Sequence, residues 1–384
     1  MVCDHSGASD WPQWHGQNRD AVSTETGFKT GDIKEAWSAD IGVGFSAVSV
    51  AGGRVFTMGN VSDEDAVWCF DEESGKLLWA HKYPCAAGSH KGPRVTPTVD
   101  GDNVYTLSRE GHLFCLGASD GKVKWDIDIT KKLDARQTRH SWGFSCSPLV
   151  RNNQLILDVG PLAALDKKTG KKVWSTGNAE AGFSSPRLMK AGTREYVLGF
   201  NADGLLIADA DGGKKIAEHE WKTEYLVNSA TPIPSGDKIF ISSGYNRGCA
   251  LLRLQNQKLK VEYENKVMRN HCNSSVLYKG HLYGFDGQQG SMGSIKCLDF
   301  DSGEVKWESP RFKIGSLMIA DGKIIALLDG GDLLIAEADT AGFKELSRTK
   351  VLDGKCWTYP VLANGRIYCR NNEAGKLVCL NAGG

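Results

Sequence analysis

The sequence lacks several features that would place it in a familiar functional class. Its 384 residues include no apolar run of about 18 residues, which a membrane-crossing helix needs. The 46 basic and 46 acidic side chains leave no net charge, so no broad positive surface is expected for nucleic acid or anionic lipid. The eleven cysteines form no C-x-x-C or C-x-x-C-H motif, the usual signals of zinc ribbons, thioredoxin-like redox sites and c-type haem. We therefore expect neither a nucleic-acid partner nor a transmembrane segment.

A short phrase recurs along the chain. It joins an apolar run, an acidic turn with glycine, and a tryptophan, and it occurs at residues 66–79, 109–125 and 293–307. The three copies read AVWCFDEESGKLLW, REGHLFCLGASDGKVKW and GSIKCLDFDSGEVKW. Short runs of β-branched and aromatic residues bounded by glycine-containing turns are typical of strands joined by hairpins. The phrase is predicted to form the third strand, turn and fourth strand of a repeated β-sheet unit.

Each unit has a strand that begins just after a turn, as in GGRVF, GDKIF or NGRIY, and these strands can be used to count the units. The first apolar residue of this strand recurs at steps of 41 to 51 residues. The eight anchors are Val55, Val104, Leu155, Tyr196, Ile239, Leu282, Ile324 and Ile367. This period predicts an all-β protein, an eight-bladed β-propeller of four-stranded antiparallel blades.

The last unit is short of one strand. Four repeat tryptophans follow their anchors by 19 to 25 residues, namely Trp79, Trp125, Trp174 and Trp307. Only 17 residues follow Ile367, whereas the segment IKEAWSADIG around Trp37 precedes the first anchor and has no blade of its own. We expect this N-terminal strand to complete the last blade, because such closure removes exposed sheet edges.

The repeat positions also predict how the blades pack. Each tryptophan is expected to bury its ring between neighbouring blades, with Tyr263 and Leu346 taking that position in blades five and seven. Three cysteines lie six residues before the repeat glycine, namely Cys69, Cys115 and Cys297. They are interpreted as small buried apolar residues, with paired or reactive thiols as the alternative.

Two parts of the chain are expected. Residues 1–33 form an N-terminal extension that packs on the propeller, and residues 34–384 form the single propeller. The extension contains SDWPQWHGQNRD, whose Trp11 and Trp14 are expected to pack on the blades, with a partner-binding patch as the alternative. The first ten residues are polar, so any export signal is expected to lie outside this sequence. Cys3 is a candidate for lipid attachment.

The repeat resembles a known family. CLGASDGKVKW and its copies look like the quinoprotein-type, or PQQ-like, repeat, and the resemblance extends over residues 34–384. That family builds eight-bladed propellers and includes quinoprotein alcohol dehydrogenases and an outer-membrane barrel-assembly lipoprotein. The opening DWPQWHGQNRDAVS is similar to that of exported PQQ-like propellers that often carry dehydrogenase names. Many family members that use the quinone have an adjacent Cys-Cys disulfide, and these members carry a calcium-binding set of Glu, Asn and Asp. This chain has no Cys-Cys pair, and no residue is matched to the calcium set.

Candidate binding residues lie in the connections between blades and in one middle-hairpin loop. In a propeller these loops open on one face beside the central channel, called the funnel here, and the blades hold them rigidly. Arginine suits carboxylate or phosphate, aromatic side chains suit stacking, and asparagine suits hydroxyl groups. We expect a small anionic or sugar-like ligand, or a protein partner, to bind at Arg94, Arg139, His140, Trp142, Tyr225, Asn228, Tyr245, Arg247, His271, Trp357 and Tyr359. The alternative is that these polar groups only satisfy backbone groups beside the channel.

Two other chemistries have weaker signals. His90, His140 and His271 come from different connections and are candidates for a shared metal, but no carboxylate joins them, so no metal is expected. The segment GFSSP around Ser184 lacks the G-x-S-x-G spacing of a hydrolase nucleophile.

The sequence is therefore compatible with two functions. The favoured one is a non-catalytic ligand- or protein-binding scaffold of the bacterial cell envelope or periplasm, expected to be a monomer without a cofactor. The alternative is a quinoprotein dehydrogenase that oxidises an alcohol or a sugar with PQQ and calcium.

Overall fold

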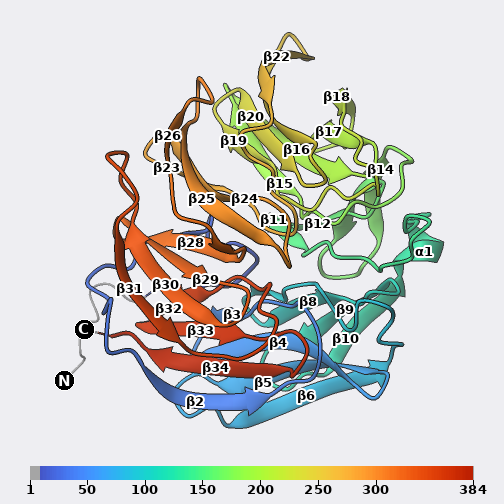
Figure 1. Ribbon diagram of the computed structural model, residues 1–384. Helices are drawn as coiled ribbons and strands as arrows, with labels where there is room; N and C mark the ends of the chain where they lie inside the picture. Colours follow the sequence, from blue (N-terminus) through green and yellow to red (C-terminus); the bar gives the residue numbers. More distant parts are fainter. Residues whose placement is uncertain (1–8, 384) are drawn as a thin grey trace.

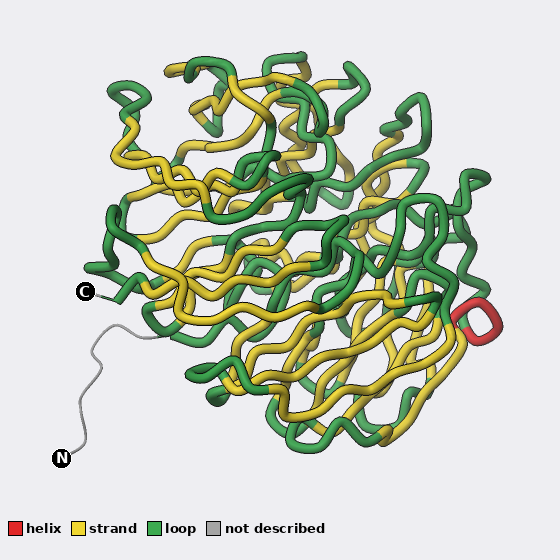
Figure 2. Tube along the Cα trace, turned by 60° about the horizontal axis from the view of Figure 1, so that its bottom comes forward, coloured by secondary structure: helices red, strands yellow, loops and turns green. Residues whose placement is uncertain are grey.

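The computed structural model describes residues 9–383, which form eight β-sheets arranged as blades around a central axis (Figure 1). Strands are the main regular element of the chain trace, and one short helix, α1 (Ile129–Lys132), lies at the edge (Figure 2). The prediction of an all-β, eight-bladed propeller is confirmed. Within residues 9–383 no helix is long and apolar enough to cross a membrane.

The first four blades each contain four antiparallel strands in chain order, and the predicted anchor lies on the second strand of each blade. Blade 1 contains β3 (Ser49–Ala51), β4 (Arg54–Val61), β5 (Glu64–Asp71) and β6 (Leu77–Pro84). Blade 2 contains β7 (Thr98–Asp100), β8 (Asn103–Leu107), β9 (His112–Gly117) and β10 (Val123–Asp128). Blade 3 contains β11 (Leu149–Arg151), β12 (Gln154–Asp158), β13 (Leu162–Asp166) and β14 (Lys172–Thr176). Blade 4 contains β15 (Arg187–Ala191), β16 (Arg194–Asn201), β17 (Gly204–Asp209) and β18 (Lys215–Glu220).

The next three blades repeat this order, and the short strand β27 (Phe312–Lys313) extends blade 6 by pairing with its third strand. Blade 5 contains β19 (Ile233–Ser235), β20 (Lys238–Ser243), β21 (Gly248–Gln255) and β22 (Lys258–Asn265). Blade 6 contains β23 (Val276–Tyr278), β24 (His281–Asp286), β25 (Met292–Asp299) and β26 (Val305–Glu308). Blade 7 contains β28 (Ser316–Ala320), β29 (Lys323–Leu327), β30 (Asp332–Glu337) and β31 (Glu345–Lys350).

Blade 8 is built from both ends of the chain. Its first three strands are β32 (Val361–Ala363), β33 (Arg366–Arg370) and β34 (Lys376–Asn381), and its fourth is β2 (Lys34–Asp40). Strands β2 and β34 run antiparallel, with Lys34 opposite Asn381 and Asp40 opposite Lys376, and lie side by side in Figure 1. The expected closure by the strand around Trp37 is confirmed.

An aromatic ring on the outer strand of one blade packs against a hairpin glycine of the next. The ring of Trp79 in blade 1 lies on Gly121 of blade 2, and its Nε1 donates a hydrogen bond to the carbonyl of Ala118 at 3.0 Å. Five blade junctions have this contact, in the pairs Trp37–Gly75, Trp79–Gly121, Trp125–Gly170, Trp174–Gly213 and Tyr263–Gly303. The repeated glycine and the repeated aromatic residue are therefore two halves of one inter-blade contact.

The register of the outer strands explains where the aromatic position falls. Every blade has a β-bulge between its third and fourth strands, and in six blades an aromatic residue lies beside it. In blade 7 the bulge pairs Ile335 with Ser347, so Ser347 holds the position assigned to Leu346. The assignment of Leu346 was wrong, because the bulge adds one residue to the strand and so reverses which face of the sheet the neighbouring side chains point to. Leu346 is exposed instead.

The cysteines at the repeat position are buried in the core. Cys69, Cys115 and Cys297 are free thiols with almost no exposed surface. Burial raises the pKa of Cys69 to about 12 and those of Cys115 and Cys297 to about 11. At neutral pH they are therefore protonated, apolar packing groups.

Residues 9–23 lie along the inner strands of the blades, and residues 24–33 continue over blades 7 and 8 toward β2. Trp11 pairs with Val50 of blade 1, and β1 (Val22–Ser23) adds a parallel strand to β28 of blade 7. The buried Arg19 donates to the carbonyls of Ser147 and Pro148 at 3.0 and 2.8 Å. These contacts tie the segment to distant blades. The division into an extension, residues 1–33, and a propeller stays a prediction, and Cys3 lies outside the described residues.

The closure predicts the effect of an N-terminal truncation. Removing residues 1–42 takes away β2 and exposes the edge of β34, so we expect aggregation or loss of a cooperative melting transition. Size-exclusion chromatography and a thermal melt measure both effects. A truncated protein that stays monomeric with an unchanged melting temperature would contradict the role given to β2.

The inter-blade contact predicts that replacing two glycines of blade 2 by alanine lowers the free energy of unfolding by different amounts. Gly121→Ala places a Cβ atom 2.5 Å from the Trp79 ring, whereas Gly101→Ala meets no atom within 4 Å. Both glycines have positive φ, so the backbone strain of about 1–2 kcal/mol is common to the two variants. We expect Gly121→Ala to lose about 1–3 kcal/mol more free energy of unfolding, from overpacking. Equal losses in denaturant melts would show that the ring contact contributes nothing.

Candidate functional site

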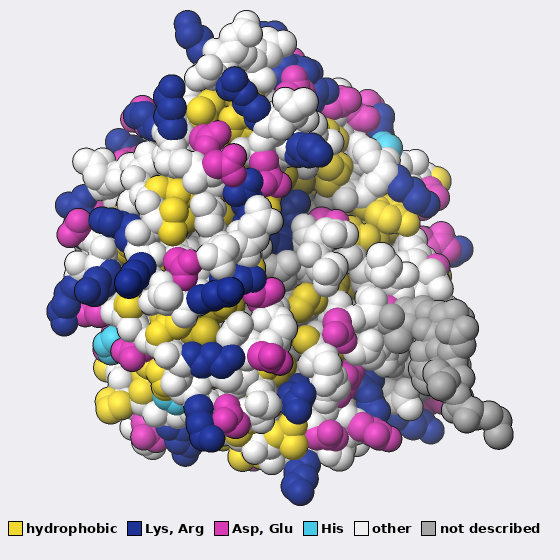
Figure 3. All heavy atoms as spheres, turned by 180° about the vertical axis from the view of Figure 1, so that it is seen from behind, with side chains coloured by type: hydrophobic (Ala, Val, Ile, Leu, Met, Phe, Trp, Pro, Cys, Tyr) yellow, Lys and Arg dark blue, Asp and Glu magenta, His cyan; other side chains and the backbone are white. Residues whose placement is uncertain are grey.

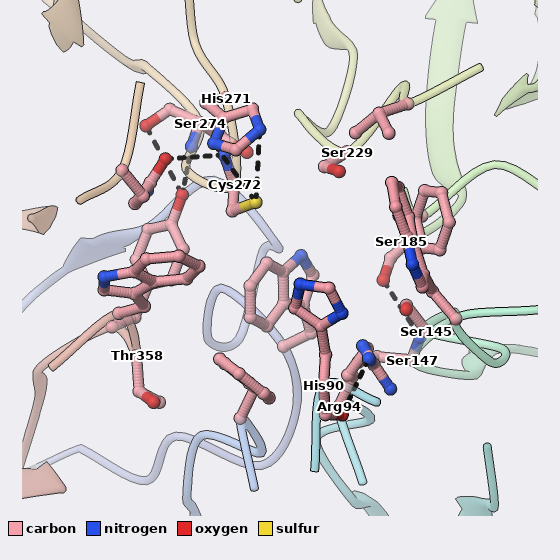
Figure 4. A pocket seen from close by; sticks show the side chains of 18 of the residues that line it. His90, Arg94, Ser145, Ser147, Ser185, Ser229, His271, Cys272, Ser274 and Thr358 are labelled. Carbon is pink, nitrogen blue, oxygen red and sulfur yellow. Dashed lines mark hydrogen bonds between the residues drawn. The ribbon is translucent and has the colours of Figure 1, made fainter. Parts of the chain in front are cut away.

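The connections between blades converge at one end of the channel and surround a cavity of about 320 Å³. They place side chains from blades far apart in sequence around a common centre, as Figure 4 shows for ten labelled residues. The lining consists of Trp14, Phe45, His90, Arg94, Trp142, Ser145, Ser147, Phe183, Ser185, Val227, Ser229, Tyr245, His271, Cys272, Ser274, Gln288, Gln289, Trp357, Thr358 and Tyr359. Trp14 belongs to the N-terminal segment, so that segment contributes to one wall of the funnel.

The structure brings six of the candidate binding residues into this lining, namely Arg94, Trp142, Tyr245, His271, Trp357 and Tyr359. Two more lie behind it. The ring of His140 stacks on Trp142 at 4.7 Å between centroids, and Tyr225 contacts both His140 and Tyr245. The role of these eight residues in binding stays a prediction.

The remaining three candidate residues lie away from the cavity and its lining. Arg139 is exposed on the connection between blades 2 and 3. Asn228 is fully buried, where its amide donates to the carbonyls of Asn201 and Trp221 at 2.8 and 2.9 Å. Arg247 lies over the Trp221 ring, 3.5 Å from its centroid, and pairs with Glu264. Structural contacts therefore occupy the side chains of Asn228 and Arg247.

Other lining residues were not singled out from the sequence. Phe45 and Phe183 stand in G-F-S triplets, and a third triplet contains Phe144 and Ser145. This repeated triplet at the start of a blade is a signal that could have found them. Phe144 is buried, so the triplet alone does not decide which ring reaches the cavity. Gln289 comes from a middle-hairpin loop and carries no such signal.

Arg94 is the one arginine or lysine in the lining, which contains no Asp or Glu. Its guanidinium donates to the backbone carbonyls of His90 and Gly92 at 3.0 and 3.3 Å, and no carboxylate in residues 9–383 is within ion-pair distance of it. Burial, and then the nearby charge of Arg109, lower the pKa of Arg94 to about 10. Arg94 is therefore charged at neutral pH and has no counter-ion among the described side chains.

His271 and Cys272 form a neutral pair on another wall. The Cys272 Sγ lies 3.5 Å from His271 Nδ1, and the Cys272 backbone N–H donates to Gln289 Oε1 at 2.8 Å. Burial lowers the pKa of His271 to about 4 and raises the pKa of Cys272 to about 12. At neutral pH neither group is charged, so the pair is not a thiolate–imidazolium nucleophile.

Arg109 holds the two long connections together. It lies in the β8–β9 loop, is buried, and donates to the carbonyls of Ala86 and Ser141, both at 3.2 Å. The first connection carries Arg94 and the second carries Trp142. Arg109 therefore sets the spacing between the cation and one aromatic wall.

Backbone strain also occurs in the funnel loops. Tyr245 and Leu226 have φ of +51° and +58°, a left-handed conformation that bulky residues seldom adopt. Such positions gather at ligand-binding sites, where the surrounding structure holds them. The ring of Tyr245 is thereby placed against His271, with centroids 4.8 Å apart.

The histidines do not assemble a metal site. His140 lies behind Trp142, and His90 contacts Trp142 edge to face at 5.4 Å. In the part of the chain that the structure describes, no three or more His, Cys, Asp and Glu side chains group to hold a metal ion.

The fold and the funnel define a class: an eight-bladed propeller that closes its ring with both chain ends and opens a cavity at one end of its channel. Comparison with known proteins makes the assignment more specific. The chain belongs to the PQQ-like repeat family described as outer membrane protein assembly factor BamB, whose model matches residues 63–309.

Individual relatives fit this assignment. The outer membrane protein assembly factor BamB of Yersinia pestis is 22% identical over 311 residues, covering 77% of this chain and 76% of that protein. The crystal structure of BamB from Moraxella catarrhalis has a TM-score of 0.66 at 15% identity, over 91% of this chain and 98% of that one. The quinohemoprotein alcohol dehydrogenase of Comamonas testosteroni has a TM-score of 0.74 at 13% identity, over 98% of this chain and 81% of that one. At these identities the solved structures show a shared fold.

The buried His271 predicts an acid-sensitive stability. Its pKa of about 4 lies below the ordinary 6.5, so the folded protein binds this proton less readily than the unfolded chain. Above pH 6.5 His271 is neutral in both states and does not lower the free energy of unfolding. As the pH falls from 6.5 toward 4, the unfolded chain takes up this proton first, and the free energy of unfolding falls by about 3 kcal/mol in total. We expect His271→Gln to remove that part of the pH dependence. Denaturant melts of both proteins from pH 7.5 to 4.5 measure it, and a constant difference across this range would contradict it.

Proposed function

We propose that the protein is a non-catalytic binding scaffold of the bacterial cell envelope that takes part in assembling outer-membrane proteins. Membership of the family described as outer membrane protein assembly factor BamB supports this role. The match to the Yersinia pestis protein covers about three quarters of both chains, which supports a role carried by the whole propeller.

The observation that carries the proposal is the chemistry of the funnel. Its lining has a charged arginine, two histidines whose pKa values are lowered by burial, and a thiol whose pKa is raised to about 12, but no carboxylate. General acid–base catalysis needs a group that titrates near the working pH. These groups suit binding better than proton transfer.

We further propose that the funnel is the binding face for a ligand or a protein partner. Its loops lie on a rigid frame, and many of its side chains are partly exposed aromatic residues, which are common in recognition surfaces. Elsewhere the surface is mixed: on the face shown in Figure 3, basic and acidic side chains are interspersed. That pattern offers no single-sign patch for a charged polymer on that face.

The similarity to quinohemoprotein alcohol dehydrogenases is the observation that supports the dehydrogenase alternative. A planar, acidic quinone would suit Arg94 and the aromatic walls. Calcium fits this lining poorly, because calcium sites are usually built on Asp and Glu carboxylates and the lining contains no carboxylate. The described funnel residues thus support quinone-and-calcium chemistry less well than plain binding.

A gene deletion in the native bacterium tests the proposal. We expect lower amounts of integral outer-membrane proteins, restored by the wild-type gene and by Arg139→Gln but less well by Trp142→Ala, because only Trp142 lines the funnel. Cell fractionation should place the protein in the envelope. Unchanged outer-membrane proteins, together with dye-linked alcohol oxidation by the purified protein loaded with PQQ and calcium, would overturn the scaffold in favour of the dehydrogenase.

A further inference from the structure

The N-terminal segment forms a loop that enters the central channel. Both ends of residues 11–24, called the peg here, are held at the β32–β33 turn. There the Asn364 side chain donates to Asp10 Oδ1 at 3.1 Å, and the Gly365 N–H donates to Glu25 Oε2 at 2.9 Å. Compact loops of this length with adjacent ends are frequently functional. Because its ends are anchored, the peg can move without opening the closure of blade 8.

The peg lies across the channel. It contacts blades on opposite sides of the ring, since Trp11 pairs with Val50 of blade 1 and Trp14 Nε1 donates to Thr231, just before blade 5, at 3.1 Å. It reaches seven blades through the pairs Trp11–Val50, Pro12–Val99, Trp14–Thr231, Trp14–Tyr359, Asn18–Arg187, Arg19–Pro148 and Val22–Ile319. The peg is therefore a stopper behind the funnel cavity, whose wall includes Trp14.

The backbone of the peg is strained. His15, Arg19 and Ala21 have φ of +60°, +55° and +59°, a left-handed conformation that residues other than glycine seldom adopt. Such conformations persist where surrounding contacts hold them. Here the blades supply those contacts, so a peg outside the channel would relax. Backbone strain thus favours release of the peg, and its contacts with the blades oppose release.

His15 is packed at the centre of the peg. Its ring stacks on Trp14 at 4.3 Å between centroids and lies edge-on to Tyr359 at 4.7 Å. The residue is 6% exposed, and its Nε2 has no hydrogen-bond partner among residues 9–383. Burial, and then the positive charges of Arg187 and Arg19, lower the pKa of His15 well below its ordinary value. The docked imidazole is therefore neutral at pH 7.

The charged groups around His15 oppose a proton there. Two cations act on it, Arg19 and Arg187, and each donates to a backbone carbonyl, at 2.8 and 2.9 Å. Asp20 is the acidic side chain whose charge acts on Arg187. The Tyr359 hydroxyl is neutral, because burial raises its pKa. A proton on His15 adds a third cation to a cluster that already holds two arginines and one aspartate.

We propose that the peg is an acid-released stopper of the channel, docked while His15 is neutral and freed when His15 takes up a proton. Release moves Trp14 out of the cavity wall and uncovers the inner strands β3 and β28, with which the peg pairs when docked. The stopper thereby couples the shape of the funnel to the pH of the surrounding solution. This device is independent of the proposed assembly role.

The direction of the pH effect follows from proton linkage. The docked His15 has a pKa below 6.5, whereas a released, solvated His15 has the ordinary value of about 6.5. Docking is therefore fully favoured above pH 6.5, and below it the released form binds the proton first. The ratio of released to docked peg rises about tenfold for each pH unit below 6.5, until the docked His15 also titrates.

Hydrogen exchange of the full chain, read by mass spectrometry of its peptides, measures release. The backbone N–H groups of Val50, Val99 and Ile319 donate to carbonyls of the peg at 2.9, 2.8 and 2.9 Å, so their exchange reports its departure. After correction for the intrinsic exchange rate, we expect the opening equilibrium at these amides to rise about tenfold from pH 6 to pH 5. Amides of β33, in the core of blade 8, report global unfolding and should change much less.

Variants assign the effect to His15. His15→Asn is neutral at every pH and tolerates the left-handed backbone, and His15→Phe keeps the ring against Trp14; both should remove the tenfold change. His219→Gln, which replaces a half-buried histidine of β18 outside the peg, should keep it. Burial raises the pKa of the anchoring Glu25, whose titration is common to all these proteins and so remains in the His15 variants.

The inference is overturned if the wild-type protein has the same opening equilibrium at pH 6 and pH 5, or if both His15 variants keep the tenfold change. It is also overturned if β33 opens in parallel with the reporter amides, because the acid effect would then be global unfolding. Loss of the change in His219→Gln would equally remove His15 as its origin.

Discussion

The contact between an aromatic ring and a hairpin glycine of the next blade is the interaction on which the rest of the structure depends. Glycine is required at Gly121 because the turn has positive φ and because the Trp79 ring occupies the space of a Cβ atom. The ring buries apolar surface against the next blade, and its N–H satisfies a backbone carbonyl there. Repeated at five blade junctions, the contact links sheets that share few main-chain hydrogen bonds.

Closure follows from the same constraint. A ring of sheets has one junction where the chain must begin and end, and an open junction would expose two edges. Strand β2 covers the edge of β34 and brings Trp37 onto Gly75 of blade 1, so the closing junction has the same contact as four other junctions. Residues 9–23 lie along the inner strands of the blades and bring Trp14 to the cavity.

Because blade junctions carry the stability, the connections at one end of the channel are available for a site. Arg109 holds two of them by their backbone carbonyls, and strained turns place Tyr245 beside His271. The resulting cavity combines one unpaired cation with neutral and aromatic groups. This arrangement supports the proposed role of the funnel in recognition.

The sequence by itself determined the fold, since period, turn glycines and the missing last strand are local patterns that repeat and so identify eight blades and the closing role of Trp37. It also identified the connections that line the funnel. Only the tertiary structure decided which side chains there face the cavity. A bulge shifts Leu346 to the surface and Ser347 to the seam, and Asn228 turns into the core to bond two carbonyls. The loop around Gln289 carries no repeated motif. The direction of a loop side chain depends on contacts with other blades, which no neighbouring residue in the sequence specifies.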